Sequence, residues 1–333
     1  FAVPEVCAAA LREGLALCSG PLLLSLFPFL VVSRLLVQCP ESDLLALPFR
    51  LAAWGIGIRT PCAARVLCIG FLGGFAPAAS AAAQAVRTGQ LTAEEADALL
   101  PACICSGPSF VVLTVGQSLL GSAELGVLLF ASQITANYLT AALLNRFAGV
   151  RSVKPGSAVP AFPAPPRLDE ILADAAITYC KLCGFILFFR MLAAGAGALL
   201  PAGAGTLCSI LLEVCSGCDL ASHTGRWGSL LCCAALSVQG LSVLLQVRTI
   251  CPPEMTLRPL YRARMLHLPL SLALFYLLLP GGEADVFSTL PARVLLMRRV
   301  PPDCALLVFA VCCMAACTLR SGIRQVEQKQ MAR

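Results

Sequence analysis

Residues 15–37 read LALCSGPLLLSLFPFLVVSRLLV and carry a single charged side chain, Arg34. About 20 consecutive apolar residues are enough to cross the hydrocarbon core of a bilayer as a helix. We therefore expect a membrane span here, kinked at Pro28, because proline lacks the N–H that an interior helical turn needs. Arg34, and Arg190 in a later apolar run, are expected to extend their charged ends toward the membrane surface.

The composition of the whole chain agrees with this expectation. Of its 333 residues, 58% are apolar and 13% are charged, and the mean hydropathy is +0.84. Soluble domains carry about 45–50% apolar and about 25% charged residues. The formal net charge is +6, but the basic residues lie between apolar runs and form no stripe. This pattern excludes a soluble enzyme and a nucleic-acid-binding protein. It indicates that the basic residues set the orientation of the chain in the membrane.

The cysteines and histidines give no sign of a metal or cofactor site. Most of the 19 cysteines lie inside apolar runs, where a free thiol behaves as a small apolar side chain. Two Cys-x-x-Cys spacings, 180–183 and 215–218, have no matching pair outside the apolar runs. His223 and His267 have no metal or nucleophile constellation around them, and we expect chance surface or interface positions. We therefore expect no cofactor and no enzymatic activity.

Several further apolar runs are long enough to span the membrane. Continuous spans are expected at about 124–145, 171–194, 263–280 and 304–319. Two other spans are interrupted: 101–120 by Ser106-Gly107-Pro108, and 228–247 by Gln239-Gly240. A short amphipathic helix is expected at 92–100, with a capping box formed by Thr92 and Glu95.

Two broken apolar runs are expected to enter the membrane and return to the same side. The first, residues 62–86, is interrupted by Gly73, Gly74 and Pro77. The second, residues 204–222, has Gly217 and Asp219 at its centre. Non-helical backbone at membrane depth is tolerated only where protein or a cavity covers it. Both runs are therefore interpreted as re-entrant hairpins.

The two halves of the chain contain similar pieces in the same order. Residues 28–35 resemble 184–191, 76–80 resemble 218–222, and 107–112 resemble 240–245. Each half then has three crossings and one hairpin, and an odd number of crossings inverts the second copy. The predicted fold is an all-α polytopic membrane bundle with inverted repeats, the plan of many transporters.

This plan divides the chain into four parts. They are a first membrane repeat (1–149), a proline-rich linker (150–168), a second membrane repeat (169–282) and a C-terminal span with a basic tail (283–333). The linker contains five prolines and reads as a polar connection. Most Lys and Arg residues outside the spans fall on the linker side, including Arg87 and Arg264, which places that side in the cytoplasm.

Several stretches resemble the sporulation integral membrane protein YlbJ family and the wider group of nucleoside-recognition, or Gate, domains. They are residues 1–36, 70–100 (beginning GFLGGFAPAAS), 105–139 and 211–222 (LLEVCSGCDLAS). The family hairpin usually has a Ser-Gly-Tyr-Pro-like turn, and Gly73-Gly74-Phe75-Ala76-Pro77 stands in its place here. The resemblance implies a role in forming the spore cortex of an endospore-forming bacterium, in its inner or forespore membrane. Related Gate domains occur in nucleoside and iron transport systems.

The candidate site residues lie in the predicted breaks. Glu213 and Asp219 are acidic residues within an apolar run, where an ionisable group usually faces a cavity or a partner; the alternative is a shallower position that reaches headgroups. Helix ends at the other breaks present free N–H and C=O groups to a polar ligand, or else the small residues serve close helix crossing. The candidates there are Ser106, Gly107, Ser109, Gln239, Gly240 and Ser242. Gln117, Gln133 and Asn137 are expected to form hydrogen bonds between helices.

Three functions remain open at this point. The chain could move a small polar solute across a spore membrane by rocking one repeat against the other. It could instead be a membrane scaffold for sporulation proteins, whose identity the sequence does not give; an intramembrane enzyme has the least support. A cavity lined by Glu213, Ser109 and Ser242 would favour transport, and tight packing there would favour the scaffold.

Overall fold

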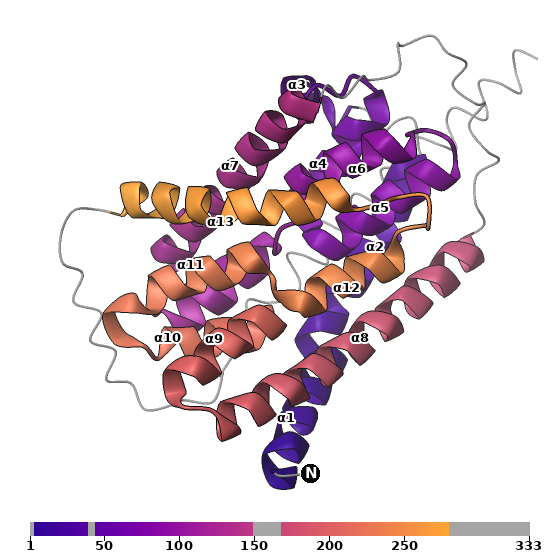
Figure 1. Cartoon of the computed structure of the whole chain (residues 1–333). Helices are drawn as coiled ribbons and strands as arrows, with labels where there is room; N and C mark the ends of the chain where they lie inside the picture. Colours follow the sequence, from indigo (N-terminus) through magenta and orange to yellow (C-terminus); the bar gives the residue numbers. More distant parts are fainter. Residues whose placement is uncertain (1–2, 39–43, 149–167, 280–333) are drawn as a thin grey trace, which may run out of the picture. The chain divides into compact units, whose positions relative to one another are not determined.

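The computed structural model describes residues 3–38, 44–148 and 168–279 of the chain. Every regular element within these ranges is a helix (Figure 1), and all of them fall in one unit of mutual contacts, Phe1–Ser288. The predicted all-α class is therefore confirmed for this part of the chain. Most of the linker 150–168, the predicted span 304–319 and the C-terminal part 283–333 lie outside the described residues.

The first apolar run belongs to a longer helical segment. Helix α1 (Pro4–Leu17) continues through a π-helical turn, η1 (Cys18–Leu22), into α2 (Leu23–Gln38). The irregular turn contains Pro21, which cannot donate a backbone hydrogen bond, so the helix widens there. Pro28, where a kink is expected, lies inside helix α2 and does not end it.

The first predicted hairpin is a pair of short helices. After α3 (Leu47–Gly55), helix α4 (Pro61–Gly73) begins with a proline in its first turn and packs against α5 (Phe75–Arg87). They are separated at Gly74, whose φ of 80° and ψ of −164° lie in a region that is essentially restricted to glycine. The break expected at Gly73-Gly74 is confirmed. The alanines of α5 are buried, which brings its backbone close to its neighbours.

The next predicted span is also broken, and its first half is longer than expected. Helix α6 (Ala93–Cys103) begins with the predicted capping box of Thr92 and Glu95. The short helix expected at 92–100 is therefore confirmed, and it runs on through Pro101 into the start of the predicted span. The chain is non-helical from residue 104 to the Ser106-Gly107-Pro108 break, and a π-helix, η3 (Ser109–Leu119), follows.

The second predicted hairpin is divided at a different residue from the one expected. Helices α9 (Ala202–Leu212) and α10 (Val214–Ser222) pack together and are separated by Glu213, which has extended backbone angles. Gly217 and Asp219 lie within α10, so placing them at the break was wrong. After η4 (Gly225–Trp227), α11 (Gly228–Val238) and α12 (Gly240–Ile250) are separated by Gln239 at a φ of 62°, which confirms the break predicted there.

Within the described residues, three helical segments are long and apolar enough to cross a membrane. They are α7 (Ala123–Ala148), α8 (Leu168–Leu199) and the segment Gly225–Ile250 that contains α11 and α12. Only 22% of the most apolar window of α8 is buried inside the protein. Large apolar side chains such as Ile177 and Phe188 are more than half exposed on it. Water is a poor solvent for such a surface, so these helices indicate a membrane protein.

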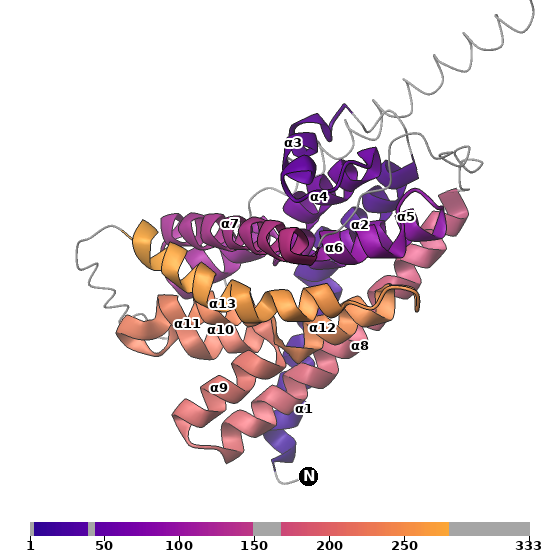
Figure 2. The same cartoon turned by 45° about the horizontal axis from the view of Figure 1, so that its top comes forward.

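The last described helix, α13 (Arg258–Leu278), packs against α6, α7 and α11. The Asp97 carboxylate on α6 accepts hydrogen bonds from the backbone N–H groups of Thr256 (2.8 Å) and Leu257 (3.1 Å), which fixes the start of α13. On the other side of the unit, α8 packs along α1, and the two lie side by side in Figures 1 and 2. Glu13 on α1 and Arg190 on α8 form an ion pair of 3.0 Å there.

Candidate functional site

In each half of the chain, the break of the short-helix pair touches the break of the interrupted span. A Cβ atom added to Gly74, between α4 and α5, would lie 2.7 Å from the backbone nitrogen of Gly107. A Cβ added to Gly240, between α11 and α12, would lie 2.8 Å from the backbone nitrogen of Glu213. Such distances leave no room for a side chain, so glycine is required at both contacts. Four helix breaks are thus arranged in two matching pairs.

Glu213 is buried because the helix after it satisfies its carboxylate. Its side chain is 3% exposed, and its two oxygens accept hydrogen bonds from the backbone N–H groups of Cys215 (2.9 Å) and Ser216 (2.7 Å). These groups are at the N-terminus of α10, where unpaired N–H groups and the helix dipole favour an anion. The predicted acidic residue therefore caps a helix at the break.

The two interrupted spans are joined by one backbone carbonyl, that of Ile104 at the end of α6. Its oxygen accepts hydrogen bonds from Arg264 Nη2 at 2.7 Å, Asn137 Nδ2 at 3.3 Å and Gln239 Nε2 at 3.4 Å. The donors come from α13, from α7 and from the break between α11 and α12. A carbonyl freed by a helix break thus bridges the two interrupted spans.

Arg264 is a buried cation without an acidic partner. It is 7% exposed, and its remaining hydrogen bonds go to Ser237 O (3.4 Å) and Asn137 Oδ1 (3.4 Å), while its Nε has no partner. Among the described residues, no carboxylate lies within ion-pair distance of it. Within the described part of the chain, carbonyl and amide dipoles are what balances its charge. A lone charge in such a place is costly and is typical of a functional position in membrane proteins.

His267 lies one turn after Arg264 on the same helix and extends the polar cluster. It is 1% exposed, and its Nε2 lies 3.2 Å from Gln133 O, which as a carbonyl can only accept, so Nε2 carries the proton. Its Nδ1 has no partner. Gln133 Nε2 in turn donates to Ser237 Oγ at 3.0 Å, and Ser237 Oγ lies 2.5 Å from Ser271 Oγ. We call Ile104, Gln133, Asn137, Ser237, Gln239, Arg264, His267 and Ser271 the central cluster.

Of the eight site residues predicted from the sequence, five lie at the helix breaks, one is buried elsewhere and two are exposed. Glu213, Gln239, Gly240 and Gly107 form the contacts described above, and Ser106 is buried in the same break as Gly107. Ser242 is fully buried on α12, where its hydroxyl accepts from Gln246 Nε2 at 2.8 Å. Ser109 and Asp219 are exposed. They therefore lie outside the buried contacts at the breaks, and a role in binding stays a prediction for both.

The two most unusual members of the central cluster are not among the predicted site residues. The sequence predicts a linker-side charge for Arg264 and a chance surface or interface position for His267, yet both are buried. Their spacing of three residues within an apolar run places them on one face of a helix, and this signal was available. The hydrogen bonds between helices predicted for Gln133 and Asn137 are confirmed, whereas Gln117 is exposed.

The fold and site together define a helical protein with membrane-length apolar helices, interrupted helices and a buried cationic cluster at the interruptions. No family model, no curated protein and no solved structure matches this chain.

Proposed function

We propose that the chain is a multi-pass membrane protein that moves a small polar solute, with a YlbJ-like role in forming the spore cortex. The observation that carries the transport proposal is Arg264, a buried cation with no acidic partner among the described residues, at the meeting point of the helix breaks. A solute with an acceptor oxygen would supply the partner that the guanidinium lacks. The sporulation role comes from the sequence resemblance alone.

Helix lengths support two re-entrant hairpins. Helices α4 and α5 have 13 residues each, and α9 and α10 have 11 and 9. At 1.5 Å per residue none is longer than about 20 Å, against a hydrocarbon core of about 30 Å. The two helices of each pair pack against each other, as expected for a segment that enters the membrane and returns to the same side. With the interrupted spans α6/η3 and α11/α12, the order of elements in the two halves supports inverted repeats.

In the proposed mechanism, the solute competes for donors that the protein now uses internally. Arg264, Asn137 and Gln239 all donate to Ile104 O, and two of these bonds are long, at 3.3 and 3.4 Å. A solute oxygen at this point would accept from the same donors after the breaks move apart. Rocking of one half against the other would expose the cluster to each side in turn. The described arrangement, with its breaks in contact, corresponds to a closed state.

A scaffold without transport is the second candidate. The close contacts of Gly74 with Gly107 and of Gly240 with Glu213 favour it, because they leave no space at the breaks. The described cavity of about 130 Å³ lies elsewhere and has none of Glu213, Ser109 and Ser242 in its lining. Transport is preferred because a scaffold has no use for a buried unpaired charge, which lowers stability.

Deletion of the chain's gene in an endospore-forming host tests the sporulation role. We expect spores that are visible but lose heat resistance, with a thin or absent cortex in electron micrographs. Reintroducing the full chain should restore the cortex, and this serves as the control for effects on neighbouring genes. Normal, heat-resistant spores from the deletion strain would remove the sporulation role and leave the membrane assignment standing.

A further inference from the structure

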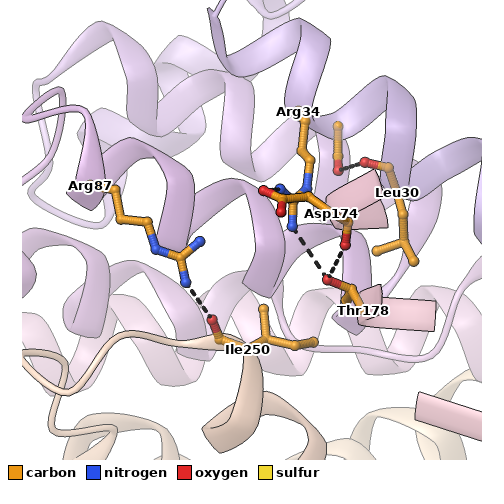
Figure 3. A network of polar contacts seen from close by, with 7 residues as sticks. Leu30, Arg34, Arg87, Asp174, Thr178 and Ile250 are labelled. Atoms are coloured by element: carbon orange, nitrogen blue, oxygen red, sulfur yellow. Dashed lines mark hydrogen bonds and ion pairs between the residues drawn. The ribbon is translucent and has the colours of Figure 1, made fainter. Parts of the chain in front are cut away.

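A second polar site lies away from the central cluster, where α2, α5, α8 and α12 meet. A cavity of about 130 Å³ is found there, roughly the volume of four water molecules. Figure 3 shows Arg34 reaching from α2 to Asp174 and Thr178 on α8, and Arg87 reaching from α5 to the end of α12. Arg34 is buried, so its predicted role as a surface anchor is wrong.

The lining of this cavity has an excess of positive charge. It includes three cations, Arg34, Arg87 and Lys181, and one carboxylate, Asp174. Asp174 is engaged by Arg34 at 2.5 Å, and its side chain is 59% exposed. Arg87 makes one weak hydrogen bond, to Ile250 O at 3.5 Å, and Lys181 has no hydrogen bond or ion pair with another described residue. Two exposed cations therefore line the cavity, and the described residues accept almost none of the hydrogen bonds that their side chains can donate.

The cavity also contains buried polar atoms without partners. Ser80, on α5, is 2% exposed, and its hydroxyl has no hydrogen-bond partner among the described residues. The Nε of Arg34 is likewise buried without a partner. Buried polar groups are nearly always hydrogen-bonded, so an unpartnered buried hydroxyl beside two cations that have few partners favours a ligand-binding role for this cavity. That ligand has to accept several hydrogen bonds and carry negative charge.

We propose that this cavity binds a phosphate group. A phosphate offers several acceptor oxygens to Arg87, Lys181 and Ser80 at once, and Arg and Lys are its usual partners. The cavity lies near the start of α8 and the ends of α2, α5 and α12, and Ile177, which lines it, is 55% exposed on the apolar face of α8. A lipid headgroup could therefore enter with its chains along α8, as could free phosphate; basic pockets between membrane helices bind such headgroups.

The test uses the purified full chain in a neutral detergent and measures its thermal unfolding temperature. The probes are inorganic phosphate, short-chain phosphatidylglycerol and, as a zwitterionic comparison, short-chain phosphatidylcholine. We expect phosphate or phosphatidylglycerol to raise the unfolding temperature in a saturable way at concentrations where phosphatidylcholine does not. A response to both probes indicates a general phosphate site, and a response to one identifies the source as lipid or as free phosphate.

The matched variants make the result specific. In the double variant Arg87→Gln/Lys181→Gln, both altered side chains are exposed, and we expect the apparent affinity to fall about 100-fold or more, since each charge-assisted contact contributes about tenfold. Arg258→Gln/Arg262→Gln removes the same charge from exposed positions outside the cavity and should bind like the parent. No stabilisation of the parent by either probe, or equal stabilisation of both double variants, would overturn the proposal.

Discussion

Replacing Arg264 with methionine is expected to keep the chain folded and to abolish its function. Removing a buried charge for which the described residues supply no acidic partner removes a desolvation cost, so we expect the free energy of unfolding to stay level or rise by about 1–3 kcal/mol. Ile104 O keeps two donors, Asn137 and Gln239, after the change. Methionine is flexible enough to fill the space that is left. The two measurements are thermal unfolding of the purified chain and rescue of the deletion strain.

Arg262→Met is the matched control, because Arg262 lies two residues away on α13 and is exposed. It should rescue the deletion strain fully and change stability little. If Arg264→Met rescues as well as the parent, the buried cation is not part of the function. If Arg264→Met instead lowers the free energy of unfolding by several kcal/mol, the role of Arg264 is structural. Transport would then lose its main support.

Replacing Gly74 with alanine is expected to be strongly destabilising. The change forces a residue with a side chain into a glycine-only backbone conformation, which costs about 1–3 kcal/mol. It also places a Cβ atom 2.7 Å from the backbone of Gly107, which cannot move aside as a flexible side chain would. Together we expect the free energy of unfolding to fall by about 3–5 kcal/mol, near the top of the range for single substitutions.

Gly57→Ala separates the two contributions. Gly57 has a positive φ of 89°, but nothing lies within 4 Å of the Cβ that would be added. Its replacement should therefore cost only the backbone strain, about 1 kcal/mol. Chemical or thermal unfolding in detergent measures both variants under one set of conditions. Equal effects at Gly74 and Gly57 would show that the helix breaks are not in contact.

Sequence reasoning found the breaks that local chemistry causes. Gly74 and Gln239-Gly240 interrupt helices because glycine there permits a positive φ. Each interruption can be recognised in the sequence because apolar residues surround it. The break at Glu213 was misplaced by several residues. Glutamate is a good helix former, and what distinguishes Glu213 is a contact with Gly240 and a capping role toward α10, both of which depend on tertiary structure.

The buried polar residues were harder to predict, because counting the charges on each side of the membrane does not say which face of a helix each charged residue occupies. Arg264 and Arg262 look alike in a topology count, yet one is buried and the other exposed on the same helix. Similarly, Arg34 was assigned to the membrane surface, because its partner Asp174 is 140 residues away in the chain. Pairings of this kind become visible only when distant helices are brought together.

In the proposed function, two re-entrant hairpins point toward each other from opposite sides of the membrane. Short epitope tags inserted singly at the exposed positions Gly57 and Gly89, which flank α4 and α5, and at Leu200 and Gly225, which flank α9 and α10, test it directly. Protease or antibody access in sealed vesicles of known orientation reports the side of each tag. We expect Gly57 and Gly89 on one side and Leu200 and Gly225 together on the other. Tags at Gly57 and Gly89 on opposite sides would mean that α4 and α5 cross straight through, which would contradict the account.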